Sequence, residues 1–249
     1  MATSANYLVL GAAGGIGTEL CQQLVSAGHR VMMCGRNGEK LQNLAQQLGQ
    51  PSLTVEASDW EAVGQAVETA IEQFGRLDGA VNLVGSLLLK PSHLTSRADW
   101  DATVSQNLTS AFGLLRAVAP QLQKNEQGGS IVLMSSAAAQ IGLPNHEAIA
   151  AAKGGIIGMA RAAAATYAAS GVRVNAVAPG LTQTPMTERV WKNDKAAATS
   201  RSMHPLGRLG EPADIASAIA WLLAPEQTWV TGQVLGVDGG LGGLKTMRN

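Results

Sequence analysis

The feature that most constrains the fold is the alternation of two kinds of segment along the whole chain. Short, continuously apolar, β-rich runs occur at residues 7–12, 30–35, 52–57, 79–85, 130–136, 172–178 and 233–240. Segments of helical length separate them, for example 16–28, 37–49 and 59–75. Continuously apolar strands are typical of a sheet buried on both faces, and this alternation favours parallel strands joined by right-handed crossovers. We therefore expect an α/β fold with one doubly wound parallel sheet of about seven strands and helices on both faces.

Length and charge narrow the classes of function. A chain of 249 residues with 46% apolar residues can bury a full core, and no segment has the composition of a linker, so we expect a single domain over 1–249. Eighteen basic and eighteen acidic side chains cancel, without a run of like charge. This balance argues against nucleic acid or an anionic membrane as a partner and favours a small-molecule substrate or further copies of the chain.

Targeting signals and metal motifs are not evident in the sequence. The first residues, MATSANYLVLGAAGG, contain no basic leader before an apolar segment, and no run of about eighteen uncharged apolar residues occurs. We expect a cytoplasmic protein that does not span a membrane. Cys21 and Cys34 lack a metal-binding spacing, so we expect reduced core thiols and no metal site.

A glycine cluster follows the first predicted strand directly and opens the first predicted helix. The glycines Gly11, Gly15 and Gly17 give the pattern G-x-x-x-G-x-G, with Ile16 inside it. Glycine allows a tight turn and lets a pyrophosphate approach the N-terminus of the helix, where free N–H groups and the dipole attract anions. A tight turn alone also needs glycine, but between a first strand and a first helix the cluster favours dinucleotide binding at these four residues.

The end of the second predicted strand bears on which dinucleotide binds. Many NAD sites present an acidic residue to the ribose 2′-hydroxyl at this point, whereas this chain has Gly35 followed by Arg36. A cation there favours a 2′-phosphate, so we expect NADP(H) rather than NAD(H). The alternative is that Arg36 is a solvated cap of the next helix.

With these motifs in place, the chain resembles the short-chain dehydrogenase/reductase family, close to its 3-oxoacyl-carrier-protein-reductase-like members, over nearly its whole length. Besides the glycine pattern, the blocks that carry the resemblance are GRLDGAVNLVG (75–85), QNLTSAF (106–112), IVLMSS (131–136), GVRVNAVAPGLTQTPM (171–186), PLGRLGEPADIA (205–216) and TGQVLGVDGG (231–240). They occur in the family's order and spacing. The resemblance implies a single-domain Rossmann fold and an oxidoreductase that uses a nicotinamide cofactor.

The resemblance also implies roles for individual residues. Asn107 matches the asparagine that holds a proton-relay water, and Ser136 matches the serine that hydrogen-bonds the substrate carbonyl. Lys153 matches the lysine that binds the nicotinamide ribose and lowers the pKa of the catalytic acid. The further cofactor contacts implied in the same way are Asn82, Gly85, Pro179, Gly180 and Thr184, with Val84 and Leu10 departing from the family pattern beside them.

The main departure from the family is the catalytic tyrosine. In the family, this tyrosine lies four residues before the lysine and thirteen after the serine, and both counts lead to Ile149. Residues 149 and 153 lie on one face of the predicted helix, so Lys153 faces the cofactor without a phenol beside it. General acid catalysis typically contributes about 10²- to 10⁴-fold, so the loss of the phenol should be strongly felt unless another group replaces it.

The two tyrosines of the chain do not fill this gap. Tyr167 lies about 27 Å further along the predicted helix, and Tyr7 opens the first strand, far from its ligand-binding end. His146 lies about one turn before Ile149 and titrates near neutral pH, so it is a candidate donor, directly or through a water. The alternative is a capping or loop residue, with Asn145 as N-cap and Glu147 favoured by the helix dipole.

The remaining histidines and the segment after the sixth strand complete the candidate site. His204 and His93 are weaker candidates, and His29 is expected to be structural. The resemblance implies a substrate lid over about 185–210. Its apolar members either line a substrate pocket or merely pack the lid onto the body: Met186, Val190, Trp191 and Met203.

Three functions remain open at this stage. The first is an NADP(H)-dependent oxidoreductase of a carbonyl or alcohol, with His146 or a bound water as the proton donor. The second is a cofactor-binding sensor or partner subunit without turnover, and the third is a reductase of a conjugated C=C bond. The identity of the substrate is not visible in the residues. The resemblance further implies a homotetramer that packs through helices near 98–125 and 147–169.

Overall fold

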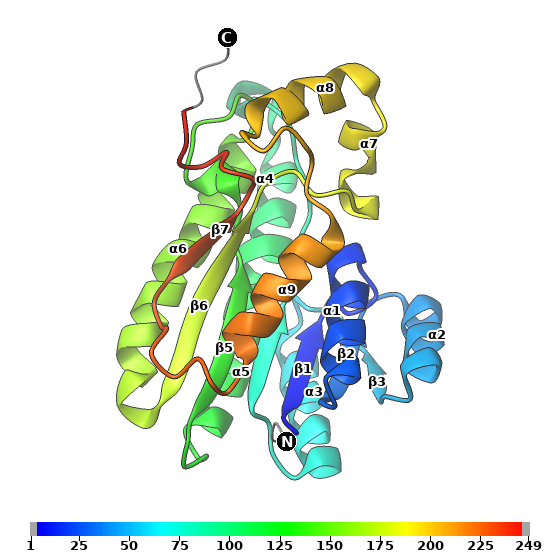
Figure 1. Cartoon of the computed structure of the whole chain (residues 1–249), viewed down its shortest axis with the longest axis vertical. Helices are drawn as coiled ribbons and strands as arrows, with labels where there is room; N and C mark the ends of the chain where they lie inside the picture. Colours follow the sequence, from blue (N-terminus) through cyan, green and yellow to red (C-terminus); the bar gives the residue numbers. More distant parts are fainter. Residues whose placement is uncertain (1–3, 246–249) are drawn as a thin grey trace.

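The sheet is parallel throughout and confirms the expected doubly wound architecture (Figure 1). The computed structural model describes residues 4–245. Its strands are β1 Asn6–Leu10, β2 Arg30–Gly35, β3 Ser52–Thr54, β4 Gly79–Asn82, β5 Gly129–Met134, β6 Val172–Pro179 and β7 Val234–Val237. They pair in the order β3-β2-β1-β4-β5-β6-β7. The order reverses between β1 and β4, and ligands of such sheets bind in the crevice beyond the carboxyl ends at that point.

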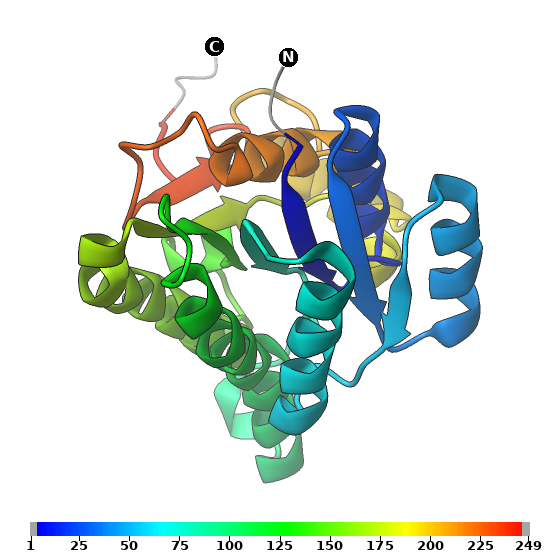
Figure 2. The same cartoon turned by 90° about the horizontal axis from the view of Figure 1, so that it is seen from below.

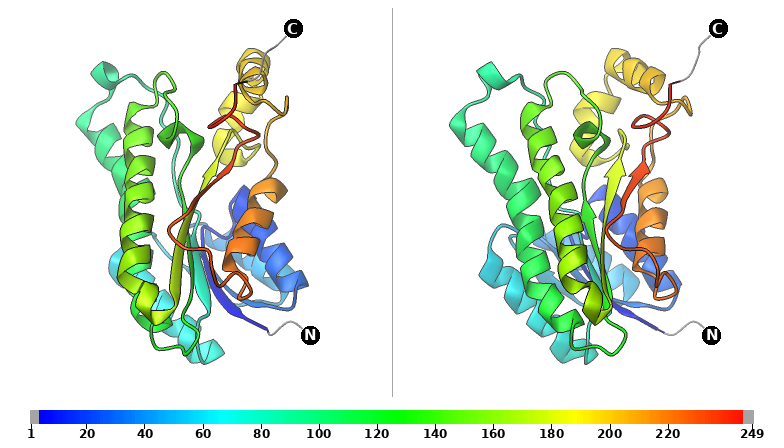
Figure 3. Two further views of the ribbon diagram at one scale, coloured as in Figure 1. Left: turned by 60° about the vertical axis from the view of Figure 1, so that its left-hand side comes forward. Right: turned by 90° about the vertical axis from the view of Figure 1, so that its left-hand side faces the viewer.

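Helices cover both faces of the sheet, as Figures 2 and 3 show. The longer helices are α1 Gly15–Ser26, α2 Gly38–Leu48, α3 Trp60–Phe74, α4 Arg97–Val104, α5 Ser110–Leu122, α6 Glu147–Tyr167, α8 Asp194–Met203 and α9 Pro212–Leu223. One core lies between the sheet and helices α3, α5 and α6, and includes Leu114 and Ile156. A second core lies beneath α1, α2 and α9, and includes Leu20 and Ile219. The site therefore rests on a sheet that is buried from both sides.

Several strands end earlier than the apolar runs suggested. The run 79–85 pairs only as far as Asn82, and the run 233–240 is strand only over Val234–Val237. The residues that follow β4 leave the sheet and line a cleft instead. Apolarity continues because these residues face a ligand space, so the pattern alone does not distinguish a strand from the wall that follows it.

The helical stretch expected near 98–125 contains an irregular turn. Between α4 and α5, residues Ser105–Thr109 form a π-helical turn, and Asn107 lies within it. The Asn107 Nδ2 donates to the carbonyl oxygen of Thr103 at 2.9 Å and to Ser86 Oγ at 3.0 Å. Such turns occur frequently at functional sites.

The segment expected to be a lid leaves the body beyond β6 and returns before α9. Its ends are joined where Thr182 pairs with Gly210, with hydrogen bonds of 2.9 Å from Gln183 N to Gly210 O and from Gly210 N to Leu181 O. Between these points lie α7 Glu188–Trp191 and α8, beyond the carboxyl ends of the strands (Figure 1).

Among the described residues, one helix is long and apolar enough to cross a membrane by length and composition, the stretch Glu147–Ser170 that begins with α6. This helix packs against β5 and β6, and its Ala152, Ile156 and Ala160 are buried in the core. Its apolar composition is accounted for by this packing.

Candidate active site

A cleft runs along the carboxyl ends of β1, β4, β5 and β6 from the glycine loop to Lys153. It encloses about 260 Å³. The sequence-predicted residues that line it are Gly11, Gly15, Ile16, Gly17, Gly85, Asn107, Ser136, Lys153, Pro179, Gly180 and Thr184. Residues far apart in the sequence are thus gathered along one elongated groove.

The glycine positions of the loop leave little room for a side chain. Gly11 has φ +91°, in the region that favours glycine, and a Cβ on Gly17 would lie 2.2 Å from the carbonyl oxygen of Gly11. A Cβ on Gly15 would lie 3.1 Å from the side chain of Thr184. The loop leads directly into α1, whose first N–H groups have no capping side chain. This arrangement fits a pyrophosphate at the N-terminus of α1.

The other end of the cleft holds Lys153 and Asn107 on either side of Gly85. A Cβ on Gly85 would lie 2.7 Å from Asn107 Oδ1 and 3.5 Å from Lys153 Nζ. Asn107 Oδ1 accepts from Ser86 N at 3.2 Å. These polar groups therefore crowd a backbone that must come close, which only glycine allows here.

Lys153 is buried without a counter-charge. Its residue exposure is 6%, and burial lowers the pKa of its ammonium to about 8. Nζ donates to the carbonyl oxygen of Met134 at 2.8 Å, its one hydrogen bond to the described residues. An ammonium carries three donors, so two remain to hold hydroxyl groups of a ligand in the cleft.

Arg36 lies at the carboxyl end of β2 and is largely exposed. Its guanidinium lies 3.9 Å from the carboxylate of Glu56. The cap of α2 is the neighbouring Asn37, whose side chain accepts from Lys40 N, so Arg36 is not the cap. Lys40 also lines the cleft. Sequence reasoning missed Lys40, although its position one turn into the helix after Arg36 was the available signal.

Asn82 is the one cofactor candidate that supports the cleft from behind. It is buried, and its Nδ2 donates to Ser110 Oγ at 3.1 Å while its Oδ1 accepts from Val84 N at 2.8 Å. These bonds hold the turn that follows β4. Asn82 therefore shapes the wall of the cleft.

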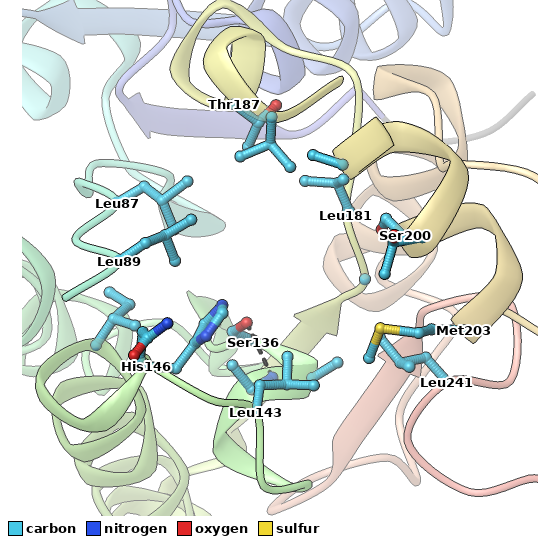
Figure 4. Close-up of a pocket in the computed structure, with 18 of the residues that line it drawn as sticks. Leu87, Leu89, Ser136, Leu143, His146, Leu181, Thr187, Ser200, Met203 and Leu241 are labelled. Carbon is cyan, nitrogen blue, oxygen red and sulfur yellow. Dashed lines mark hydrogen bonds between the residues drawn. The ribbon is translucent and has the colours of Figure 1, made fainter. Parts of the chain in front are cut away.

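A larger cavity of about 630 Å³ adjoins the cleft (Figure 4). The two share six lining residues, among them Ser136 and Ile149. Apolar side chains that line the larger cavity are Leu87, Leu89, Leu143, Leu181, Val190, Met203 and Leu241. A substrate in this cavity would therefore meet a cofactor in the cleft beside Ser136.

The junction of cleft and cavity holds no phenol. Ile149 is 4% exposed and offers no polar atom there. Tyr7 is buried, its hydroxyl donates to the carbonyl oxygen of Leu223, and its pKa is raised to about 12, mainly by burial. Tyr167 ends α6, far from Ile149. Ser136 Oγ accepts from Ala138 N at 3.2 Å, and no acceptor in the described residues takes its hydroxyl proton.

His146 lies in the cavity wall close to Ser136 and Ile149. Its Nδ1 lies 2.8 Å from the carbonyl oxygen of Pro144, which can only accept, so Nδ1 carries a proton. Nε2 has no hydrogen bond to the described residues and is free to serve a ligand. Figure 4 shows Ser136, Leu143 and His146 bordering the same part of the cavity.

The start of α6 differs from the expectation. The N-cap position is held by His146, whose carbonyl accepts from Ala150 N at 2.7 Å, and its ring caps nothing. The expected N-cap, Asn145, was wrong: it adopts a left-handed conformation at φ +65°. Its carbonyl instead accepts from Lys90 N at 2.8 Å. Asn145 thus turns the chain so that the imidazole faces the cavity.

The rings of His204 and His29 already have hydrogen-bond partners in the protein, and His93 lies outside the cleft and the cavity. His204 is 2% exposed, its Nδ1 donates to Ser200 O at 2.7 Å, and its Nε2 accepts from Leu181 N at 3.2 Å. His93 is exposed on a 3₁₀ turn and lines neither the cleft nor the cavity. His29 accepts from Ala5 N, and burial lowers its pKa.

The segment expected to be a lid, residues 185–210, contributes to both spaces. Val190 and Met203 line the larger cavity, and Met186 lines the cleft. Trp191 instead donates from Nε1 to the carbonyl oxygen of Thr184 at 2.9 Å. Three of the four apolar residues of this segment therefore line the cleft or the cavity, and Trp191 holds the segment to the chain that follows β6. Lys195, on the first turn of α8, also borders the larger cavity.

Known proteins are similar to this chain in sequence and in fold. The family model described as Enoyl-(Acyl carrier protein) reductase matches residues 11–242. A 3-oxoacyl-(acyl-carrier-protein) reductase FabG from Thermotoga maritima is 37% identical over 243 residues, which cover 94% of this chain and 96% of that protein. A short-chain type dehydrogenase/reductase from Mycobacterium ulcerans superposes with a TM-score of 0.93 at 30% identity, covering 97% of this chain and 91% of that one.

A second similar solved structure contains NADPH. An actinorhodin polyketide ketoreductase variant with NADPH superposes with a TM-score of 0.91 at 29% identity, over 98% of this chain and 100% of that one. The breadth of these matches, together with the cleft and its Ser136 and Lys153, settles the assignment. The chain belongs to the short-chain dehydrogenase/reductase family of oxidoreductases.

Proposed function

We propose that this protein is an NADP(H)-dependent oxidoreductase that reduces a carbonyl group, with His146 supplying the proton that a tyrosine supplies elsewhere in the family. The observation that carries this proposal is the free Nε2 of His146 in the wall that also holds Ser136 and Ile149. Lys153 and the cleft lie directly behind that wall.

The cleft supports a nicotinamide dinucleotide. The glycine loop and the N-terminus of α1 would hold the pyrophosphate, and the two free donors of Lys153 would hold the ribose at the other end. Arg36 and Lys40 supply two cations beside the end of β2, which favours a 2′-phosphate and hence NADP(H). The bound cofactor supplies the hydride.

The chain's own groups handle the substrate oxygen. Ser136 Oγ donates a hydrogen bond to the carbonyl oxygen and stabilises the negative charge that grows there as hydride arrives. His146, as imidazolium, transfers its Nε2 proton to that oxygen and leaves a neutral imidazole. The carbonyl of Pro144 accepts from Nδ1–H in both states, so the ring keeps its orientation. Water at the open mouth of the cavity restores the proton.

A four-protein comparison tests the proton donor. NADPH oxidation is measured for wild type, His146→Gln, Ile149→Tyr and the double variant on ketones, quinones, and 3-oxoacyl and enoyl thioesters. We expect His146→Gln to lower kcat on a ketone by about 10²-fold or more, and the added phenol of Ile149→Tyr to restore turnover in the double variant. Equal kcat for wild type and His146→Gln on every substrate would remove His146 from the mechanism.

Reduction of a conjugated C=C bond is the second candidate, favoured by the apolar Ile149 and by the description of the matching family model. Hydride then adds to carbon, and no phenol is needed at the carbonyl oxygen. Turnover of enoyl thioesters alone, with His146→Gln as active as wild type, would support this candidate. The sensor or partner-subunit hypothesis requires tight NADPH binding without turnover of any substrate, so sustained NADPH oxidation excludes it.

We also propose a single domain with a lid over about 185–210 and assembly as a homotetramer. Trp100 on α4 and Phe112 on α5 are 42% and 44% exposed, and they offer apolar surface on the helices expected to pack against other copies. Light scattering of the purified protein tests this assembly. The cytoplasmic location stays a prediction from the sequence.

A further inference from the structure

Helix α8 forms one side of the larger cavity. Leu87, Leu89 and His146 face it from one side, while Ser200 and Met203 of α8 face it from the other (Figure 4). The residues of α8 that line the cavity are Lys195, Ala196, Thr199, Ser200 and Met203. Their spacing places them on one face of the helix, so α8 presents a defined stripe to the substrate.

The polar groups of this stripe lack partners in the protein. Lys195 forms no ion pair or hydrogen bond with the described residues, and the hydroxyls of Thr199 and Ser200 form none either. By contrast, the neighbouring Lys192 pairs with Glu188. Three donors on one face are thus available to a ligand in the cavity.

The cavity wall carries a positive side chain and no carboxylate. Among the described residues that line it, Lys195 is the one lysine or arginine, and no aspartate or glutamate lines it. Asn193, the N-cap of α8, also borders the cavity, so the positive end of the helix dipole adds to the charge of Lys195. The apolar side chains of the wall include five leucines, Ile149, Val190 and Met203.

We propose that the natural substrate is an oxo acid, in which an apolar chain joins the reacting carbonyl at Ser136 to a carboxylate that Lys195 binds from the lid. The hydroxyls of Thr199 and Ser200 donate to the same carboxylate. This inference rests on the proposed function for the identity of the reacting end. Recognition of the anionic end is a separate property and can be measured without turnover.

The first test measures binding alone. Calorimetry compares decanoate with decanol on the protein saturated with NADP⁺, for wild type, Lys195→Met, Lys195→Arg and Lys192→Met. We expect wild type to bind decanoate about tenfold or more tightly than decanol, as one charge-assisted contact provides. Lys195→Met should abolish this preference, while Lys195→Arg and the control Lys192→Met should retain it. Equal affinities in wild type, or a preference that survives in Lys195→Met, would overturn the inference.

The second test uses turnover and separates the two proposals. Oxo acids with four to eight carbons between carbonyl and carboxylate are compared with their methyl esters by kcat/KM. We expect the acid to be favoured by about tenfold in wild type and the ratio to fall towards one in Lys195→Met. Equal reduction of acid and ester overturns the oxo-acid inference and leaves the reductase proposal intact. If decanoate binds as expected but no carbonyl is reduced, the reductase proposal fails and the carboxylate site stands.

Discussion

The cleft and the larger cavity differ in the residues that form them. The cleft is lined by six glycines, which come from the glycine loop and from the turns that follow β4 and β6, and Lys153 is its buried charge. The cavity is formed by side chains from loops, the start of α6 and the lid. Substitutions are poorly tolerated at glycines where an added side chain would meet neighbouring atoms. Each substitution of a side chain that lines the cavity, in contrast, changes the surface of the cavity. We therefore expect the cleft to be similar among relatives and the cavity to differ between them. Ile149 lies where the two spaces meet.

The strongest test of this contrast is a methyl group in the glycine loop. Gly17→Ala places a Cβ 2.2 Å from the carbonyl oxygen of Gly11, so the loop must open. We expect NADPH affinity to fall by at least about 100-fold, roughly 3 kcal/mol. Fluorescence titration with NADPH measures the affinity.

The matched control is Gly64→Ala on α3, where a Cβ meets nothing within 4 Å. This change should leave NADPH affinity intact and raise the free energy of unfolding by about 0.5–1 kcal/mol, because alanine favours the helix. A loop variant that bound NADPH as well as this control would refute a cleft fixed by its backbone.

The next test concerns the buried charge. The pKa of Lys153 is about 8 in the folded protein and 10.5 in the unfolded chain, so below pH 8 folding buries a charge at a cost of up to about 3 kcal/mol. Between pH 8 and 10.5 the unfolded chain binds the extra proton, so stability rises with pH. We expect cofactor-free Lys153→Met to be more stable than wild type by up to about 3 kcal/mol at pH 7 and by about 1 kcal/mol at pH 10. Urea unfolding at both pH values measures this, and a pH-independent difference would contradict it.

Cofactor choice gives the third test. Arg36→Gln removes a cation beside the end of β2, and a charge-assisted contact with a 2′-phosphate corresponds to about 10- to 100-fold in affinity. We expect KM for NADPH to rise by that factor and KM for NADH to change little. Arg97→Gln, on α4 and paired with Asp101, is the matched control. Equal effects of Arg36→Gln on both cofactors would show that Arg36 does not select between them.

The smallest expected effect lies on the cavity side. Asn145 has φ +65°, a conformation that costs alanine about 1 kcal/mol more than it costs glycine. We expect Asn145→Ala to lower the free energy of unfolding by about 1 kcal/mol and to lower kcat by misplacing His146, and we expect Asn145→Gly to retain both. Chemical unfolding and ketone turnover provide the measurements. Similar losses in the two variants would mean that the Asn145 side chain itself matters.

The fold and the cleft were largely predictable from the sequence. Strands buried on both faces require apolar runs, and a phosphate at a helix N-terminus requires glycines at fixed positions, so both leave local patterns. Gly11 and Gly17 follow from such a pattern. Leu83 and Val84 were not predicted to line the cleft, because a run that leaves the sheet to line a cleft stays apolar, and Gly85 was expected there only through the family resemblance.

The cavity could be predicted only in part. His146 was identified by its distance along the helix from Ile149, but the direction of its ring depends on the left-handed turn at Asn145, which the residues around it did not reveal. His204 was a weaker candidate donor in the sequence. Its two hydrogen bonds to Ser200 and Leu181 come from tertiary packing, and they give the ring a structural role.

The paired ends of the lid have a consequence for how new specificities arise. Thr182 and Gly210 meet as neighbouring backbone, so the excursion between them starts and finishes at nearly one point of the body. A segment anchored in this way can be replaced as a unit, while the strands, the glycine loop and Lys153 stay in place. Exchanging this segment between relatives of the chain is therefore a direct way to change the substrate range while the rest of the domain stays the same.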